Sequence, residues 1–413
     1  MRHWGLFRFI AVFALSLLSC GYAFAQENLP ELQILDARIA SAPERSRIVF
    51  DLSAETGYST FPIDQPDRLV IEFSVDKVAD TAPANVEGTG LLSKMSLGMI
   101  DDGLARAVIF LNQPVQVADI NLVKAEGDQP ARLVIELAPG TREIFDAAVD
   151  AIKAQSQQSE AQSQQPTVDI IPAPNLETES AAPIAVRPLI IIDPGHGGID
   201  MGATGSSGEY EKLIVLQIAK RLQAELVALN RFDVALTRDG DSFLTLNERV
   251  QLARDNQANL FVSLHADTFD QPEIRGAGVY TRDENATDVL DKVLAEYENQ
   301  SDLVAGFNPP AQDNGVVGIL VDLMRRETRR QSYVVAQQLV RQMGGRLTMR
   351  QQPLRQADFF VLQAPEVPSV LIELGFLSNE SDMRNLTQAE WQQRAAQSIA
   401  QGIAKYFDVS VQP

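Results

Sequence analysis

The sequence predicts a protein of several domains: an N-terminal all-β sandwich, a flexible linker, and a C-terminal α/β domain with a central sheet covered by helices. Three observations predict this organisation. Residues 31–140 contain short segments in which apolar and polar residues alternate. The stretch that follows is rich in Gln, Ser and Pro. From Leu189 onward, apolar strand candidates alternate with amphipathic helices. A chain of 413 residues is long enough to give each domain its own core.

The first 25 residues have the pattern of a secretory signal peptide. Arg2 and Arg8 precede the apolar run 9–18, and the small residues of the motif AFA fit a cleavage site after Ala25. We therefore expect export. Two alternatives stay open: an uncleaved anchor, although the run is short for a bilayer span, and a lipoprotein acylated at Cys20. No later segment is expected to span a membrane.

Net charge and cysteine content exclude some classes of function. The net charge of −20 argues against nucleic-acid binding, because a basic face supplies most of that affinity. Cys20 is the only cysteine, and cleavage after Ala25 removes it, so the mature chain has no disulfide or thiol chemistry. An exported, acidic chain of this kind fits an extracytoplasmic enzyme or a wall-binding protein. Nothing in the sequence demands more than a monomer.

Residues 31–140 predict a small sandwich of two similar sheets. The segments SRIVFDLS, DRLVIEFS, RAVIFLN and ARLVIELA each alternate apolar and polar residues, as half-buried strands do. The first pair is echoed by the second pair later in the domain. A duplicated four-strand unit is the simplest account of that echo.

Residues 141–186 are predicted to be a flexible linker, because their Gln- and Ser-rich composition cannot form a core. Residues 187–408 then predict the α/β domain, with helices on both faces of the sheet. Its strand candidates are LIIID, FDVALTR, NLFVSLHAD, GAGVYT and SVLIELGF. A polar-rich insert at about 283–330, with two helix candidates of its own, interrupts this alternation of strands and helices.

Two histidines remain once the signal peptide is removed, and each directly follows an apolar strand candidate. His196 follows LIIID and His265 ends NLFVSLH; strand ends are where sites collect in α/β sheets. Glu211 begins the helix after His196. Two imidazoles and one carboxylate, with an open position for water, form a catalytic zinc site. The plainer readings are that His196 is a polar turn residue and that Glu211 favours its helix dipole.

A fourth residue has the properties of a general base. Glu373 lies inside the otherwise apolar segment SVLIELGF, where an unpaired carboxylate is costly. Burial would raise its pKa toward the range in which a carboxylate acts as a base. The alternative is a structural carboxylate paired with an arginine such as Arg249.

The motifs IIIDPGHGGIDMGATG…GEYEK, FVSLHAD and PSVLIELGFLSN resemble the zinc-dependent N-acetylmuramoyl-L-alanine amidases of the Gram-negative cell-separation type. The β-rich half resembles the AMIN domain of that family, a peptidoglycan-targeting module. The resemblance implies that His196, Glu211 and His265 bind Zn²⁺ and that Glu373 is the catalytic acid/base. It also implies the substrate, the amide between N-acetylmuramic acid and L-alanine in peptidoglycan, and a periplasmic role in septal wall splitting and cell separation.

The resemblance further implies that the insert covers the zinc until a LytM-domain activator protein displaces it. The nearest candidate for the blocking acid is Asp288, with Glu296 in reserve. Asp288 could instead simply favour a helix N-terminus. Four apolar residues of the second insert helix are candidates for activator docking, with ordinary packing as the alternative. They are Ile319, Leu320, Leu323 and Met324.

Two other functions stay open at this point. A zinc peptidase that cuts within the stem peptide would use the same site chemistry, and product analysis would separate it from an amidase. A catalytically inactive peptidoglycan-binding scaffold is the other, and its zinc content would discriminate it from an enzyme.

Overall fold

The structure, a computed structural model, describes residues 31–42, 44–163, 187–308 and 319–410. The predicted signal peptide with Cys20, and residues 164–186 of the predicted linker, lie outside these ranges. From Leu32 onward the chain forms one compact unit. Within the described ranges, no helix combines the length and the apolar character that crossing a membrane requires.

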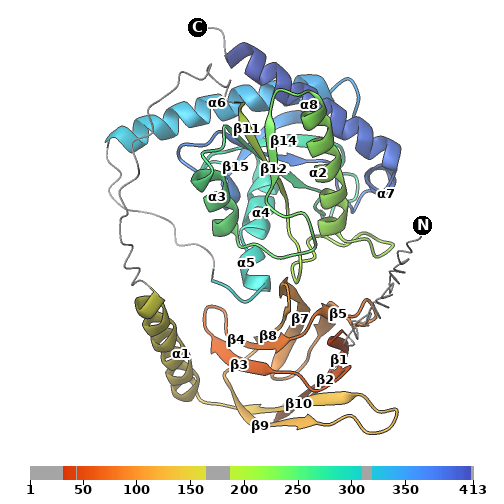
Figure 1. The fold of residues 1–413 in the computed structure, drawn as a ribbon, viewed down its shortest axis with the longest axis vertical. Coiled ribbons are helices and arrows are strands. Elements are labelled where there is room, and N and C mark those ends of the chain that lie inside the picture. The colour runs from red at the N-terminus through yellow and green to blue at the C-terminus, as the bar shows by residue number, and fades with distance from the viewer. Residues whose placement is uncertain (1–30, 43, 164–186, 309–318, 411–413) are drawn as a thin grey trace, which may run out of the picture. The chain divides into compact units, whose positions relative to one another are not determined.

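The N-terminal part consists of two five-stranded sheets (Figure 1). The first has the strand order β5-β1-β2-β10-β9 and the second β3-β4-β8-β7-β6. The strands of the first sheet are β1 (Gln33–Ala42), β2 (Arg45–Leu52), β5 (Lys77–Val78), β9 (Val115–Val123) and β10 (Ala131–Pro139). The strands of the second are β3 (Tyr58–Ile63), β4 (Arg68–Ser74), β6 (Asn85–Glu87), β7 (Leu92–Asp101) and β8 (Leu104–Leu111).

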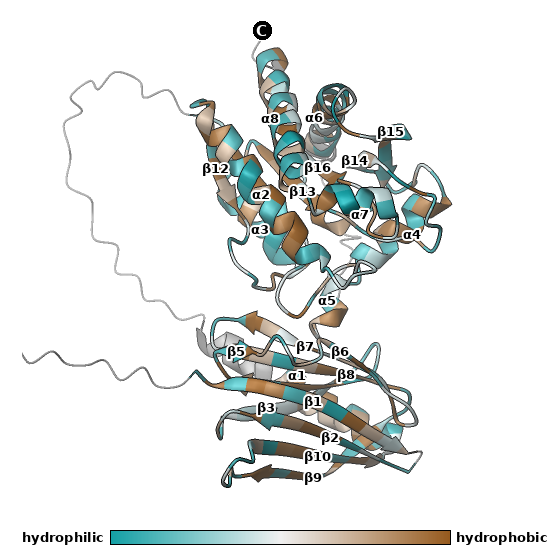
Figure 2. Ribbon diagram, turned by 90° about the vertical axis from the view of Figure 1, so that its right-hand side faces the viewer, coloured by the Kyte–Doolittle hydropathy of each residue, from teal (hydrophilic) through white to brown (hydrophobic). Residues whose placement is uncertain are grey.

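Each of these sheets combines strands from both copies of the sequence repeat. β2 pairs antiparallel with β10, and β4 pairs antiparallel with β8. The alternation of hydrophobic and hydrophilic residues along the strands (Figure 2) gives each sheet one apolar face. The two apolar faces share one core, in which the rings of Phe50 and Phe73, one from each sheet, lie 4.8 Å apart.

The segment predicted as linker begins with a helix, α1 (Arg142–Ser163). Its Ala- and Gln-rich composition favours helix. Phe145 and Val149, one turn apart, are both buried. Burying side chains of this size stabilises by about 1.5–3 kcal/mol each, which explains why this part of the segment is ordered against the β domain. A helix of polar composition with one apolar turn is hard to distinguish from a linker by composition alone.

The C-terminal part contains a six-stranded sheet of order β12-β11-β13-β16-β14-β15. The strands are β11 (Leu189–Pro194), β12 (Asp233–Leu236), β13 (Leu260–His265), β14 (Ala277–Arg282), β15 (Met349–Ala357) and β16 (Ser369–Glu373). β12, β11, β13 and β16 run parallel, whereas β14 runs antiparallel to β16. The helices around it are α2 (Glu211–Ala228), α3 (Leu246–Asp255), α6 (Ile319–Met343), α7 (Glu380–Leu386), α8 (Ala389–Ser410) and the 3₁₀ helix η1 (Phe360–Leu362).

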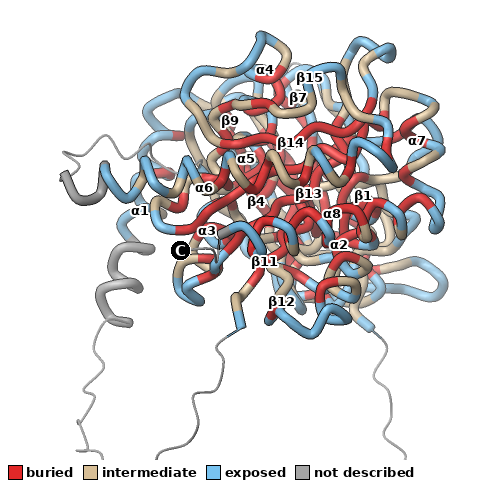
Figure 3. Tube along the Cα trace, turned by 90° about the horizontal axis from the view of Figure 1, so that it is seen from above, coloured by how far each residue is buried: buried red, intermediate tan, exposed pale blue. Residues whose placement is uncertain are grey.

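Helices cover both faces of this sheet, as the sequence predicted. Ile190 and Ile192 of β11 pack into a core that includes α2, α6 and α8. Ile191, between them, packs on the opposite face with residues of α3. Figure 3 shows the result: β11, β13 and β14 are buried along their lengths, while outward turns of the helices are exposed. Burial on both faces explains why β11 and β13 are mostly apolar along their length instead of alternating between apolar and polar residues.

The predicted insert contains α4 (Val289–Glu298), the short α5 (Ser301–Val304) and the start of α6; residues 309–318 lie outside the described ranges. The buried side of α4 is not its most apolar side, on which Val289, Val293 and Tyr297 recur at helical spacing. Leu294 is buried, but so is the charged Asp291. The exposed residues of α4 include Val289, Val293 and Tyr297.

Charge pairing explains this rotation of α4. Arg355 of β15 donates to both oxygens of Asp291, at 2.9 and 2.7 Å. The Tyr280 hydroxyl also donates to Asp291, at 3.0 Å. A buried carboxylate requires such partners, so the partners on β14 and β15 determine which face of the helix turns inward.

In α6, the side chains of Leu323 and Met324 are 55% and 41% exposed. Those of Ile319 and Leu320 are outside the described side chains. The proposed activator-docking role of these four residues stays a prediction.

Candidate metal centre and active site

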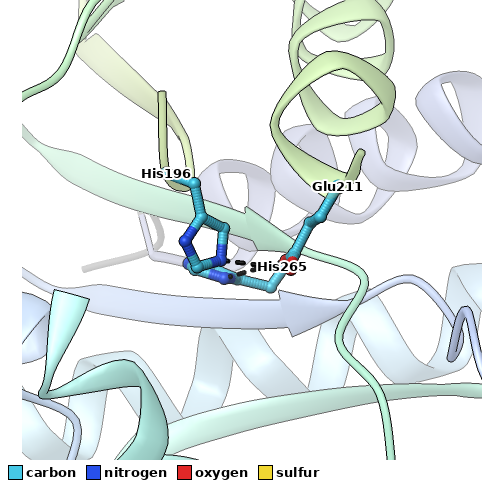
Figure 4. Close-up of side chains that lie close together, drawn as sticks. All are labelled: His196, Glu211 and His265. Carbon is cyan, nitrogen blue, oxygen red and sulfur yellow. Dashed lines mark ion pairs between the residues drawn. The ribbon is translucent and has the colours of Figure 1, made fainter. Parts of the chain in front are cut away.

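The three predicted metal ligands meet at the carboxyl edge of the parallel strands (Figure 4). His196 follows β11, His265 is the last residue of β13, and Glu211 is the first residue of α2. β11 and β13 are paired in the sheet, so their carboxyl ends lie side by side. The chain bends sharply at His196, which has a φ of 57° in the left-handed region and is followed by two glycines that also have positive φ.

Their ligand atoms are close enough for one metal ion. One nitrogen or oxygen atom from each of the three residues lies within 4.8 Å of the others, and all three residues are buried. His196 Nε2 is 3.1 Å from Glu211 Oε2, and His265 Nδ1 is 3.2 Å from Glu211 Oε1. The sequence prediction that these residues form one cluster agrees with this geometry.

Buried nitrogen atoms without a hydrogen-bond partner indicate whether the site fits a metal ion. Within the described part of the chain, His196 Nε2 and His265 Nδ1 are buried and have no hydrogen-bond partner. Leaving a buried polar atom unpaired costs about 1–3 kcal/mol, so each such atom needs an explanation. Both atoms point at Glu211, and two imidazole nitrogens with one carboxylate are a donor set that suits Zn²⁺. The residues therefore fit a zinc ion.

The ligands are oriented by a second layer of hydrogen bonds. His196 Nδ1 bonds Asp200 Oδ2 at 2.8 Å, which leaves Nε2 free for a metal. Asp200 accepts further hydrogen bonds from the backbone N–H of Gly202 and from the Ser301 hydroxyl. Because Ser301 belongs to α5, the insert contributes to the layer that orients His196.

Glu211 is held by two backbone donors. Its Oε1 accepts from Ala266 N at 2.7 Å and its Oε2 accepts from Ala203 N at 2.8 Å. Burial would raise the pKa of Glu211, but the facing imidazole of His196 holds this pKa well below its ordinary value. Glu211 therefore stays ionised, as a metal ligand must.

The centre favours positive charge. Burial alone lowers the pKa of His196, yet the neighbouring carboxylates Asp200, Glu211 and Glu298 hold it well above its ordinary value. Carboxylates that favour an imidazolium favour a metal cation for the same reason.

Two buried arginines hold the loop that carries His196. Arg249 donates to His196 O at 2.7 Å and to Asp193 Oδ1 at 2.7 Å. Arg238 donates to Gly195 O at 2.7 Å. The pairing of Arg249 with Asp193 answers one question that the sequence left open, since this arginine is not the partner of Glu373.

Glu373 lies beside the three ligands. It ends β16 and is the direct sheet neighbour of His265. Its side chain is fully buried; Oε2 accepts from Asp267 N at 3.3 Å, while Oε1 has no partner among the described residues. Burial and the charges of Asp267 and Glu211 raise the pKa of Glu373 well above its ordinary value. Such a group is suited to accept and return a proton.

Asp288 and Glu296, the two acids that the sequence indicated as candidates for blocking the metal, make their contacts away from the three ligands. Asp288 caps the start of α4, accepting from Asp291 N at 2.9 Å, and pairs with Arg355. Glu296 is 60% exposed and lies 3.7 Å from Lys292. The plainer reading of Asp288, a residue that favours the helix N-terminus, is the one that the structure matches.

Glu298, which the sequence analysis missed, approaches the ligands instead. Its Oε2 lies 3.1 Å from His265 Nδ1 and its Oε1 lies 3.5 Å from His196 Nε2. A signal was present: Asp291, Leu294 and Glu298 recur at helical spacing and share the buried face of α4. Asp288, at the first turn of α4, lies at the opposite end of the helix from Glu298.

We expect Gly202→Ala to abolish metal binding. A Cβ at this position would lie 2.6 Å from His196 Cδ2 and 2.7 Å from Glu211 Oε2, and φ is +63°. Metal content by mass spectrometry should fall from one ion per chain to less than about a tenth of that. Gly240→Ala, where nothing lies within 4 Å, is the matched control. Full metal content in Gly202→Ala would contradict this assignment of the ligands.

The fold and the site define an α/β protein with a buried His-Glu-His centre that can bind a metal ion, next to a buried carboxyl group. Residues 190–405, about half of the chain, match the family Amidase_3, described as N-acetylmuramoyl-L-alanine amidase. The chain belongs to this family, and the resemblance predicted from its motifs is confirmed. It is thus an amidase, a hydrolase of the class that degrades peptidoglycan.

Relatives of similar length support this assignment. The chain is 31% identical to the N-acetylmuramoyl-L-alanine amidase AmiC of Neisseria meningitidis serogroup B, over 97% of this chain and 95% of that protein. It is 30% identical to AmiC of Escherichia coli O6:H1, over 91% of this chain and 89% of that protein. Among solved structures, the catalytic domain of the amidase CwlV from Bacillus (Paenibacillus) polymyxa is 28% identical, covers 54% of this chain and 99% of that chain, and has a TM-score of 0.40.

Proposed function

We propose that this chain is a zinc-dependent hydrolase that cleaves the amide between N-acetylmuramic acid and L-alanine in peptidoglycan. The observation that carries the proposal is the convergence of two unpaired buried imidazole nitrogens on Glu211, one strand away from the buried Glu373. His196, Glu211 and His265 would hold the ion. Zn²⁺ bound there would polarise the amide carbonyl and lower the pKa of a coordinated water.

Glu373 carries the proton transfers in this proposal. Its raised pKa and its unpaired Oε1 support a role as base toward the attacking water and then as acid toward the leaving nitrogen. Asp200 holds the imidazole of His196 through Nδ1 during the reaction. Arg249 and Arg238 keep the loop of His196 in place through its carbonyl oxygens.

The proposed cellular setting is the periplasm, after export through the signal peptide, with septal wall splitting and cell separation as the outcome. In this setting the β-rich N-terminal part acts as an AMIN-like targeting domain on peptidoglycan. A LytM-domain protein serves as activator, and the chain works as a monomer. The full-length similarity to AmiC proteins supports this setting.

The insert holds the enzyme inactive in this proposal. Glu298 takes the open side of the three ligands, where substrate must enter. The side chain is 5% exposed, so the closed insert also excludes water and substrate from the centre. Activation then requires α4 to move away.

A peptidase that acts within the stem peptide would use the same groups, and an inactive scaffold would need none of them. The family match favours the amidase over both.

Product analysis tests the proposed reaction. The zinc-loaded chain carrying Glu298→Ala is incubated with purified peptidoglycan, and the soluble products are analysed by mass spectrometry. We expect intact stem peptides with a free L-alanine amine. Shortened stem peptides would identify a peptidase instead. The absence of any product from a zinc-loaded variant, even with a LytM-domain activator, would leave the scaffold.

A further inference from the structure

The sheet that contains β4 and β8 is buried on both faces, although the alternation of its strands predicts that only the face toward the core is buried. In β4 and β8, residues that include Leu69 and Ala107 point into the shared core of the two sheets. The alternate residues point the other way, and we call these the outer-face cluster. They are Arg68, Val70, Arg106 and Val108, with exposed fractions of 0%, 0%, 6% and 0%. The outer face of such a sheet normally meets solvent, so something must cover it.

Residues 303–308, which begin with the last two residues of α5, cover this cluster; we call them the closing segment. Arg68 donates to Leu303 O at 3.2 Å and to Phe307 O at 3.1 Å, and also to Asn308 Oδ1 at 2.8 Å. Arg106 donates to Ala305 O at 2.6 Å, and its guanidinium lies 4.5 Å from the ring centre of Phe307. Both arginines thus satisfy backbone carbonyls of one short segment.

Apolar contacts complete the fit. Ala305 is fully buried in a small cluster with Val70 and Val108. Gly306 has a φ of 80°, and a Cβ there would lie 3.1 Å from Val70 Cγ2. The backbone of the closing segment therefore approaches the sheet as closely as a residue without a side chain allows.

Arg68 is buried in this contact and depends on its hydrogen bonds there. Burial lowers the pKa of Arg68 to about 10, which measures the cost of removing its guanidinium from water. Hydrogen bonds to the closing segment offset part of that cost, and those to Pro66 O and Asp64 O in the β domain offset another part. Removing the acceptors of the closing segment would leave part of this cost without compensation.

The closing segment is linked directly to the metal centre. Glu298 ends α4, and Ser301, which donates to Asp200, begins α5 two residues before the closing segment starts. On the other side of the centre, Ile199 N of the His196 loop donates to Met99 O of β7, at 2.7 Å. The β domain therefore contacts both the loop that carries a ligand and the insert that covers it.

We propose that the outer-face cluster is a docking surface for the closing segment of the same chain and thereby holds Glu298 over the metal ligands. The β domain is then a clamp on the insert as well as a targeting module. This inference rests on the proposed function, whose regulation it deepens. Whatever separates the β domain from the closing segment loosens α4 and favours the active state.

Val108→Glu in the full-length, zinc-loaded chain tests the clamp. The glutamate places a charge in the apolar contact but lies on the face of β8 opposite the core of the β domain. Val117→Glu is the matched control, because Val117 lies in the same domain and is already 39% exposed. Phe307→Ala weakens the contact from the insert side, where it cannot unfold the β domain. Hydrogen exchange at Gly306 and Phe307, and peptide release from peptidoglycan, are measured beside Glu298→Ala.

We expect both contact variants to exchange about tenfold faster at these amides and to release more peptide than the wild type. Val117→Glu should match the wild type. Unchanged exchange in both contact variants would overturn the clamp, and so would unchanged release while Glu298→Ala is active. If Glu298→Ala is itself inactive with zinc bound, the proposed function fails, and exchange alone still decides whether the β domain holds the segment.

Discussion

Replacing Glu298 with alanine is expected to raise the basal release of stem peptides from peptidoglycan by on the order of 10- to 100-fold without an activator. The carboxylate of Glu298 lies 3.1 Å from His265 Nδ1, and in the proposed autoinhibition it takes the side from which substrate would approach. Alanine at this position removes the side chain that binds the closed centre, so the closed insert loses part of its stability relative to the open one. The measurement is the initial rate of appearance of free L-alanine amines, with the zinc content of each sample determined in parallel.

Glu296→Ala is the matched control for this experiment. Glu296 lies on the same helix and carries the same charge, but it is exposed and its partner is Lys292. It should behave as the wild type does. If Glu298→Ala binds zinc normally and its basal rate stays unchanged, then Glu298 does not hold the enzyme inactive. If Glu296→Ala activates to the same extent, general weakening of α4 explains the effect better than loss of a blocking carboxylate.

Replacing Glu373 with glutamine, in the Glu298→Ala background, is expected to lower kcat by about 10²- to 10⁴-fold. Glutamine keeps the size of the side chain and can still accept from Asp267 N, but it cannot carry a proton between water and the leaving nitrogen. Because Glu373 is not one of the three converging ligands, zinc content should stay at the level of the parent. KM should change much less than kcat, since the carboxyl group acts in the chemical step.

Glu390→Gln, at an exposed position near the start of α8, is the control for Glu373→Gln. Zinc content separates the two explanations for an inactive variant. Loss of zinc together with activity would make Glu373 part of the metal site. If the Glu373→Gln variant retains zinc and more than about a tenth of the parent activity, Glu373 does not carry the proton transfer.

The four residues proposed for the chemistry could be predicted from the sequence because histidines are few in this chain and because neighbouring residues predict the strands that carry them. The chain has three histidines, and the two outside the predicted signal peptide lie at or just after the end of a strand that its own apolar run predicts. Parallel strands bring their carboxyl ends together, so residues far apart in sequence were expected to meet. Glu373 could be singled out because a carboxylate is rarely found inside an apolar strand.

Glu298, the residue proposed to block the centre, could not be identified from the sequence in this way. The period of α4 predicts a helix but leaves open which side turns inward, and its most apolar side includes Val293 and Tyr297, which are exposed. Asp291 decides the rotation by pairing with Arg355, a residue of β15 far along the chain. That pairing carries Glu298 to the ligands and leaves Glu296 in solvent. Helical spacing places Glu298 on one face with Asp291 and Leu294, but nothing local in the sequence indicates that this face, instead of the more apolar one, turns inward.

By itself, then, the sequence predicted the order of domains, five of the six strands of the C-terminal sheet, and the four residues proposed for the chemistry; β15 (Met349–Ala357) was not predicted. Each of these follows from local patterns: alternation, helical period, and polar residues at strand ends. Only the tertiary structure decided that Glu298 faces the ligands and that Arg68 and Arg106 lie under the closing segment. Alternation along β4 and β8 predicts one buried face. The second face is buried because a distant segment offers carbonyl oxygens that match two guanidinium groups, and that complementarity exists only once the chain has folded.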